Sequence, residues 1–166
     1  MIIREKAGRI DDYKILGAEP DWLDLEWFET RKRILHKTTS RGIAVSLKFL
    51  AESPEITEGD VLYAGPEGLI VARILPCDCI VVKPGSIFET ASLCYEIGNK
   101  HLPLFFEKDA LLVPFEAPLY RLLTAQGYAV LREDRKLLQP LKTTVSPHNS
   151  VNSGSLFSKI MQLTNS

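Results

Sequence analysis

The sequence predicts an α+β protein with a small β-barrel or sandwich domain (residues 1–75), a ferredoxin-like βαββαβ domain (residues 76–141) and a mobile tail (residues 142–166). Three observations support this division. Short strand-like segments separated by turn residues fill the first part. Alternating and helical apolar patterns succeed one another in the second part. The final segment is rich in Ser, Asn and Thr and shows no apolar period.

The composition excludes several classes of protein. Apolar residues make up 45% and charged residues 25%, as in an ordinary globular protein. The net charge of −1 argues against a nucleic-acid partner held by bulk positive charge. No apolar run approaches the roughly 20 residues that span a bilayer, and the N-terminus has no signal-peptide core. We therefore expect a cytoplasmic protein that makes no membrane contact and keeps its cysteines as thiols.

The N-terminal domain is predicted from strand patterns alone. Residues 24–36 are rich in β-formers without a helical period, so they form one long strand or two short ones. Residues 43–48 alternate apolar and polar side chains, as in a half-buried strand. Further strands follow the glycine-containing turns at residues 58–60 and 65–68. This spacing is typical of a small barrel or sandwich.

The second domain begins with a strand at residues 79–83 and a helix. Ser86 and Glu89 form a capping box that opens the helix. The helix continues with residues that recur at helical spacing, namely Phe88, Ala91, Tyr95 and Gly98. Cys94 lies within it and is expected in the core.

The second half of this domain is predicted to contain two strands, a second helix and a last strand. Residues 104–107 and 110–114 form two strands joined by a tight turn. Pro118 suits the first turn of a second helix, which Gly127 closes. A last strand follows at residues 128–132. The order strand, helix, strand, strand, helix, strand is that of a ferredoxin-like fold.

The first helix leads into an elbow that carries one histidine. Gly98 and Asn99 are expected to close the helix, because either residue can adopt the left-handed backbone of a C-cap. His101 follows, and Pro103 then favours an extended path. A neutral imidazole is a common ligand for borderline metals. The alternative is an ordinary exposed turn residue, since no second ligand is near in the sequence.

The elbow resembles a known family signature. Residues 95–103 read Tyr-Glu-Ile-Gly-Asn-Lys-His-Leu-Pro, similar to the Tyr-x-(Leu/Ile)-Gly-Asn-(Arg/Lys)-His-x-Pro motif of UreE, the urease accessory protein and nickel metallochaperone. Residues 29–33, 39–42 and 58–62 also resemble that family. The resemblance implies a nickel carrier that is not an enzyme. It also implies that His101 is the principal metal ligand and that the N-terminal domain contacts partners.

The tail departs from many members of the family, which end in a His-rich segment. This tail has a single histidine, His148. The resemblance implies that His148 is an accessory metal ligand. The alternative is a mobile residue with no such role.

One imidazole cannot hold Ni(II), which takes about four to six donors with nitrogen and oxygen ligands. A symmetric homodimer would bring His101 of both subunits to one point near the two-fold axis. Zn(II) or Cu(II) could occupy the same site, and metal could link dimers into higher oligomers. Affinity should fall at acid pH, since a protonated imidazole cannot ligate. The resemblance further implies that the partners are the accessory GTPase and the urease maturation complex.

A basic run leaves its own alternatives open. It comprises Arg31, Lys32, Arg33, Lys37 and Arg41. It is either a solvated strand face balanced by acidic neighbours or a docking surface for an acidic partner. An RNA-binding barrel would use the same run, but interleaved aromatics and a basic pI are not evident. His36, in the same segment, is expected to be a surface residue.

The cysteine pair also has two interpretations. Cys77 and Cys79 lie on the same side of a predicted strand, so they are either a soft-metal pair or small, mostly buried hydrophobes. A thiol or metal enzyme built on these residues would need a base and an orienting partner around a pocket. The three histidines lie in separate segments, which disfavours that alternative.

Overall fold

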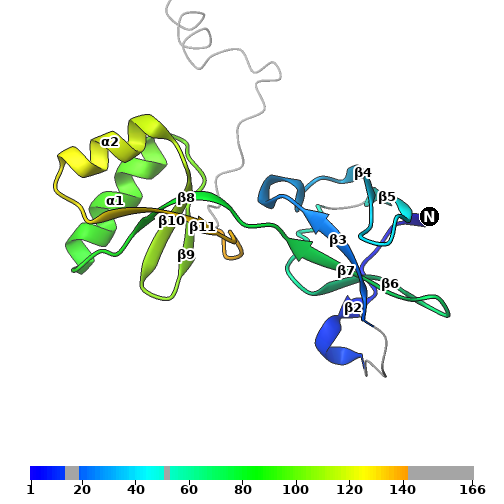
Figure 1. Ribbon diagram of the computed structural model, residues 1–166. Helices are drawn as coiled ribbons and strands as arrows, with labels where there is room; N and C mark the ends of the chain where they lie inside the picture. The colour runs from blue at the N-terminus through cyan, green and yellow to red at the C-terminus, as the bar shows by residue number, and fades with distance from the viewer. Residues whose placement is uncertain (14–18, 51–52, 142–166) are drawn as a thin grey trace, which may run out of the picture.

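The computed structural model describes residues 1–13, 19–50 and 53–141. The predicted tail at residues 142–166, with His148, lies outside the described residues. Figure 1 shows strands without long helices in the first half of the chain and a helix-covered sheet in the second. The prediction of an α+β fold with a β-rich N-terminal domain is confirmed.

Two small sheets make up the N-terminal part. The first has the order β1-β5-β4, with β1 at Ile2–Ile3, β5 at Ala44–Lys48 and β4 at Ile34–Thr38. The second has the order β2-β6-β7-β3, with β2 at Gly8–Arg9, β6 at Asp60–Gly65, β7 at Gly68–Ile74 and β3 at Asp21–Leu25. Short 3-10 turns lie at Ile10–Asp12 and Trp27–Glu29. Residues 24–36 therefore hold parts of two strands, separated by the second of these turns.

These sheets share one apolar core, because their inward-facing residues alternate along each strand. Val45 and Leu47 of β5 are buried as the alternation predicts, and Ile43 packs against them from the preceding turn. The core is completed mainly by residues of β3, β6 and β7: Leu23, Leu25, Leu62, Ile70, Ala72 and Ile74.

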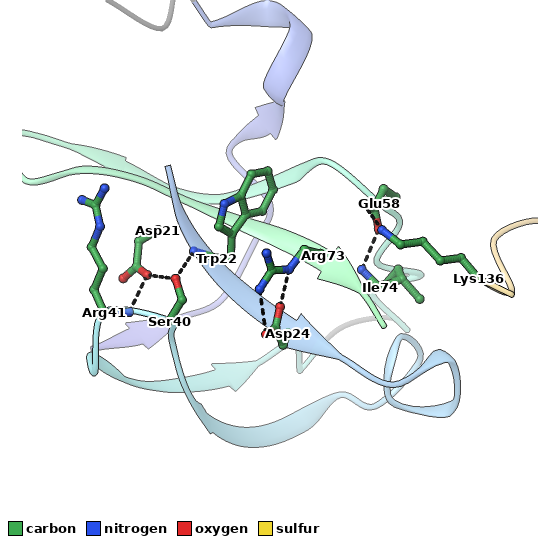
Figure 2. Close-up of polar contacts among 9 residues, drawn as sticks. All are labelled: Asp21, Trp22, Asp24, Ser40, Arg41, Glu58, Arg73, Ile74 and Lys136. Carbon is green, nitrogen blue, oxygen red and sulfur yellow. Dashed lines mark hydrogen bonds and ion pairs between the residues drawn. The ribbon is translucent and has the colours of Figure 1, made fainter. Parts of the chain in front are cut away.

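Polar contacts fix the turns around this core (Figure 2). The carboxylate of buried Asp21 accepts hydrogen bonds from Ser40 Oγ (2.8 Å) and from the N–H of Arg41 (2.9 Å). Burial alone would raise the pKa of Asp21, but hydrogen bonds from the turn that follows β4 outweigh it, so the pKa is lowered. On the same strand Asp24 pairs with Arg73 at 2.6 Å. The turn after β4 is thus held to β3.

The C-terminal part has the predicted ferredoxin-like topology. Its elements are β8 (Cys77–Val82), α1 (Ile87–Asn99), β9 (Phe105–Glu107), β10 (Ala110–Pro114), α2 (Ala117–Ala125) and β11 (Val130–Arg135). The sheet order is β11-β8-β10-β9, and neighbouring strands are antiparallel. Both helices cover one face of this sheet (Figure 1).

Strand β8 is buried on both faces. Ile80 and Val82 face the helices and pack with Leu93, Ile97, Leu119 and Leu123. Cys79 and Val81 face the other side, where they pack with Phe105, Leu112, Leu137 and Trp27. This second cluster includes Trp27 from the N-terminal part, so it lies where the two parts meet.

Two specific contacts join the N-terminal and C-terminal parts. The rings of Trp27 and Phe105 meet edge to face with centroids 5.7 Å apart. Lys136 Nζ lies 2.8 Å from Glu58 Oε1, and the other oxygen of Glu58 accepts the N–H of Ile74 at 2.6 Å (Figure 2). The two parts are therefore joined by aromatic and charged contacts as well as by the peptide link between β7 and β8.

Both helices begin as the sequence predicts, with one difference in detail. Ser86 Oγ accepts the N–H of Glu89 at 3.1 Å. The Glu89 carboxylate accepts from Gly85 at 2.6 Å instead of from Ser86, one residue further back than in a standard capping box. Pro118 lies in the first turn of α2. Neither α1 nor α2, the α-helices of the described part of the chain, is long and apolar enough to cross a membrane.

Candidate metal centre

His101 occupies the left-handed position that ends α1. The helix runs to Asn99, and the φ angle of His101 is +56°. Gly98 lies inside the helix, and neither Gly98 nor Asn99 has a positive φ. The prediction that one of these two residues supplies the left-handed cap was therefore wrong. Histidine itself makes the turn.

The hydrogen bonds at this end form a Schellman motif. The N–H of His101 donates to the carbonyl of Gly98 (2.9 Å), and the N–H of Leu102 donates to the carbonyl of Ile97 (3.4 Å). Leu102 packs on the same apolar cluster that contains Ile97. This contact fixes which residue turns the chain, because Leu102 must reach the core directly after the turn. It explains why the helix continues past Gly98.

Glycine normally fills the left-handed position of such a cap. A residue with a Cβ pays roughly 1–2 kcal/mol of steric strain there. Strain of this kind is often kept at functional sites, where the side chain matters more than the backbone energy. Glu55 and Lys108 also have positive φ angles, so the conformation together with an exposed imidazole makes His101 a candidate functional residue.

The surroundings of His101 suit a cation. His101 is exposed and follows the C-terminus of α1, where the helix dipole favours positive charge. Glu96 and Lys100 form an ion pair at 3.5 Å in the last turn. Among the described residues there is no group of three or more His, Cys, Asp or Glu side chains that could hold a metal ion. Within the described part of one chain, His101 therefore does not belong to such a group.

An exposed apolar stripe runs along the helix that ends at His101. Ile87, Phe88 and Tyr95 are 89%, 78% and 72% exposed, and Ala91 between them is also exposed. Phe88, Ala91 and Tyr95 are the residues whose spacing predicted the helix. They face away from the core, which Leu93 and Ile97 of the opposite face fill. An exposed apolar stripe of this kind often marks an interaction surface.

His36, the other histidine among the described residues, is not brought to His101. His36 is exposed on β4 in the N-terminal part, where its Nδ1 lies 2.8 Å from Ser46 Oγ. This position agrees with the prediction of a surface residue. His148 lies outside the described residues, so its assignment as an accessory ligand stays a prediction.

The basic run is partly neutralised within the chain. Glu29 pairs with Lys37 at 2.6 Å and with Lys32 at 3.8 Å. Burial raises the pKa of Glu29, but the hydrogen bond from Lys37 and its other neighbours outweigh this and lower the pKa overall. Arg31 and Arg33 remain exposed. Part of the run thus matches the balanced face that the sequence allowed, and part remains open to an acidic partner.

The predicted cysteine pair is close in space. The sulfur atoms of Cys77 and Cys79 lie 3.6 Å apart, Cys79 is fully buried and Cys77 is half-buried. Burial, with a contribution from the neighbouring thiol, raises the pKa of Cys79 to about 12, and burial also raises the pKa of Cys77. Both are therefore thiols at neutral pH. Cys94 is half-buried against the helix core, close to what was expected.

Comparison with family models agrees with the two parts of the fold. Residues 3–75 match the model of the UreE urease accessory protein N-terminal domain. Residues 77–150 match that of the UreE urease accessory protein C-terminal domain. The two matches meet at the link between β7 and β8.

Curated relatives agree over nearly the whole chain. A urease accessory protein UreE of Flavobacterium johnsoniae is 44% identical over 163 residues, which cover 98% of this chain and 99% of the relative. Those of Acetivibrio thermocellus and Helicobacter acinonychis are 38% and 35% identical, covering 85% and 92% of this chain and 92% of each relative. These matches imply a role in urease maturation. The chain belongs to the UreE family of urease accessory proteins.

Proposed function

We propose that this protein is a metallochaperone, and not an enzyme, that carries Ni(II) for assembly of the urease active site. In this proposal the metal lies at a homodimer interface and is bound by His101 from each subunit. The observation that carries it is an exposed imidazole held in a left-handed backbone where glycine would be more stable. Because the chain belongs to a family of urease accessory proteins, Ni(II) is the metal that we propose for this imidazole.

A second subunit supplies what one chain lacks. In the described part of the chain His101 belongs to no group of three or more donor side chains, and Ni(II) takes about four to six donors. A two-fold axis near the elbow would double the number of imidazoles. The apolar stripe of Ile87, Phe88 and Tyr95 lies on the same helix and would be covered in such a dimer. The surface and the incomplete ligand set therefore favour the same assembly.

His148 is proposed as an accessory ligand that reaches the site from the tail. Water would complete the coordination. A site with few rigid ligands at a surface suits a carrier, because its metal must be released to a recipient, whereas structural zinc sites are closed. Zn(II) and Cu(II) would compete for it, since both bind imidazole. Metal-linked pairs of dimers are a further possible assembly of the same parts.

The recipient is proposed to be the urease maturation complex in the cytoplasm, with its accessory GTPase as the direct partner. Residues 1–75 would serve partner contacts, and residues 76–141 would hold the metal. Exposed Arg31 and Arg33 are candidate contacts for an acidic partner surface. No nucleic acid or membrane takes part in this proposal.

The direct test is a nickel titration by calorimetry at neutral pH, with mass followed by light scattering. The expected result is about one tight Ni(II) per dimer for the wild type and an affinity at least about 100-fold lower for His101→Ala. His148→Ala should weaken binding without abolishing it. His36→Ala is the matched control, because it removes another exposed histidine far from the elbow, and it should bind as the wild type does.

The proposed dimer interface is tested separately, by placing a charged side chain on the apolar stripe of α1. Tyr95→Glu should give a monomer in light scattering and lower nickel affinity, because a carboxylate would be buried in the dimer. Phe28→Glu changes a 52% exposed aromatic residue of the N-terminal part and should leave the dimer intact. The proposal fails if His101→Ala binds nickel as tightly as the wild type.

A further inference from the structure

A second possible metal site lies away from His101, at the start of β8. Cys77 and Cys79 are two residues apart on this strand, and their sulfur atoms are 3.6 Å apart without being joined in a disulfide. For one ion to lie between the two sulfurs they must move apart, which rotation about the side-chain torsions of two residues on one strand face permits. Cys79 is fully buried, whereas half-buried Cys77 gives access from solvent.

The surroundings of the pair select a soft ion. The sulfurs lie beside an apolar cluster that includes Phe105, Leu112 and Trp27. No third His, Cys, Asp or Glu side chain completes a metal-binding group in the part of the chain that the structure describes. The oxygen atoms near Cys79 Sγ are the carbonyls of Cys77 (3.2 Å) and Arg135 (3.7 Å). Zn(II) generally requires four ligands. Thiolates favour soft ions such as Cu(I), which binds stably with fewer ligands.

We propose that Cys77 and Cys79 together bind one Cu(I) ion in a two-thiolate site that is separate from His101. Each thiol loses its proton as the ion binds, so two protons are released for one Cu(I) and no electron is transferred. The site does not depend on the proposed nickel function. In a nickel carrier, however, it would hold copper on sulfur and keep it from the imidazole site, since soft ligands attract Cu(I) more strongly.

The experiment titrates the full chain with Cu(I), supplied without oxygen and with reductant, against a colorimetric copper(I) chelator. The wild type should withdraw about one Cu(I) per chain from the chelator, as two thiolates per chain predict. Cys77→Ser should weaken binding at least about 100-fold, because one of the two ligands is lost. Cys79→Ala, checked for folding by circular dichroism, should do the same.

Two controls separate this site from others. Cys94→Ser removes the remaining cysteine, and His101→Ala removes the proposed nickel ligand; both should bind Cu(I) as the wild type does. X-ray absorption at the copper edge should show two sulfur neighbours. The proposal is overturned if the wild type leaves copper on the chelator, if Cys94→Ser or His101→Ala loses it, or if imidazole nitrogen dominates the copper shell.

Discussion

Helices α1 and α2 end in the same hydrogen-bonded cap but use different residues to make it. In α2 the N–H of Gly127 donates to Thr124 and the N–H of Tyr128 donates to Leu123. In α1 the corresponding donors are His101 and Leu102. The φ angles of the turning residues are +85° for Gly127 and +56° for His101. Glycine is the low-energy choice for this position, and α1 does without it.

The comparison separates what the fold requires from what the function requires. A Cβ atom built on Gly127 would meet no other atom within 4 Å, so space alone does not demand glycine there. The difference between the two caps therefore lies in backbone strain and in the side chain presented. At the end of α2 the chain has glycine, which adopts this backbone conformation without strain. At α1 it presents an imidazole, which we connect with metal binding.

The largest expected effect comes from removing the core residue beneath each cap. Ile97→Ala and Leu123→Ala each remove a fully buried side chain, so each should lower the free energy of unfolding by about 3 kcal/mol. Only Ile97→Ala should also weaken nickel binding, because Ile97 and Leu102 share the cluster that sets the elbow. Chemical denaturation and calorimetry measure the two effects. Equal loss of nickel affinity in Leu123→Ala would contradict a special role for the end of α1.

A smaller effect is expected from Gly127→Ala. The substitution forces a Cβ into the left-handed region and should lower the free energy of unfolding by about 1 kcal/mol, with nickel affinity unchanged. Gly98→Ala is the matched control. Gly98 is helical and a Cβ there meets no atom within 4 Å, so alanine should stabilise the metal-free chain by up to about 1 kcal/mol. If both alanines destabilise alike, the assignment of the left-handed residues is wrong.

The beginning of α1 should matter for stability alone. Ser86→Ala removes the cap on the N–H of Glu89 and should lower the free energy of unfolding by about 1 kcal/mol or less. Nickel affinity should not change, because Ser86 lies at the opposite end of the helix from His101. Thermal unfolding at fixed protein concentration, followed by a nickel titration, tests this. A marked loss of nickel affinity would show that the two ends of α1 are coupled.

Local rules predicted much of this fold from the sequence. Ser86 opens α1, Pro118 lies in the first turn of α2 and Gly127 closes α2, because each of these signals depends on a few neighbouring residues. The same dependence on neighbouring residues made the prediction for the end of α1 wrong. Gly98 and Asn99 are the better left-handed formers, but the tertiary contact of Leu102 with the core decides where the chain turns. Local propensity cannot reveal such a contact.

The candidate site could be predicted only in part. The motif around His101 identified the residue through family resemblance, but the strain of its backbone could be seen only in the folded chain. The spacing of Phe88, Ala91 and Tyr95 predicted the helix correctly, yet periodicity alone does not say which face of the helix is buried. Their alternation on a strand predicts that Cys77 and Cys79 share one face, spaced by roughly 6.6 Å along the strand. The 3.6 Å separation of their sulfur atoms depends on side-chain orientation, which the sequence does not reveal.

The central claim is that His101 is kept at the cap for its imidazole at a cost in stability, and His101→Gly tests it most directly. Nickel affinity and the free energy of unfolding of the metal-free protein are measured on the same preparation, beside His101→Ala. Glycine relieves strain of roughly 1–2 kcal/mol but adds unfolded-state entropy worth about 0.5–1 kcal/mol. The account predicts that His101→Gly binds nickel at least about 100-fold more weakly and has a free energy of unfolding higher than that of the wild type by up to about 1.5 kcal/mol. A variant that keeps wild-type nickel affinity, or that becomes less stable than the wild type, would contradict it.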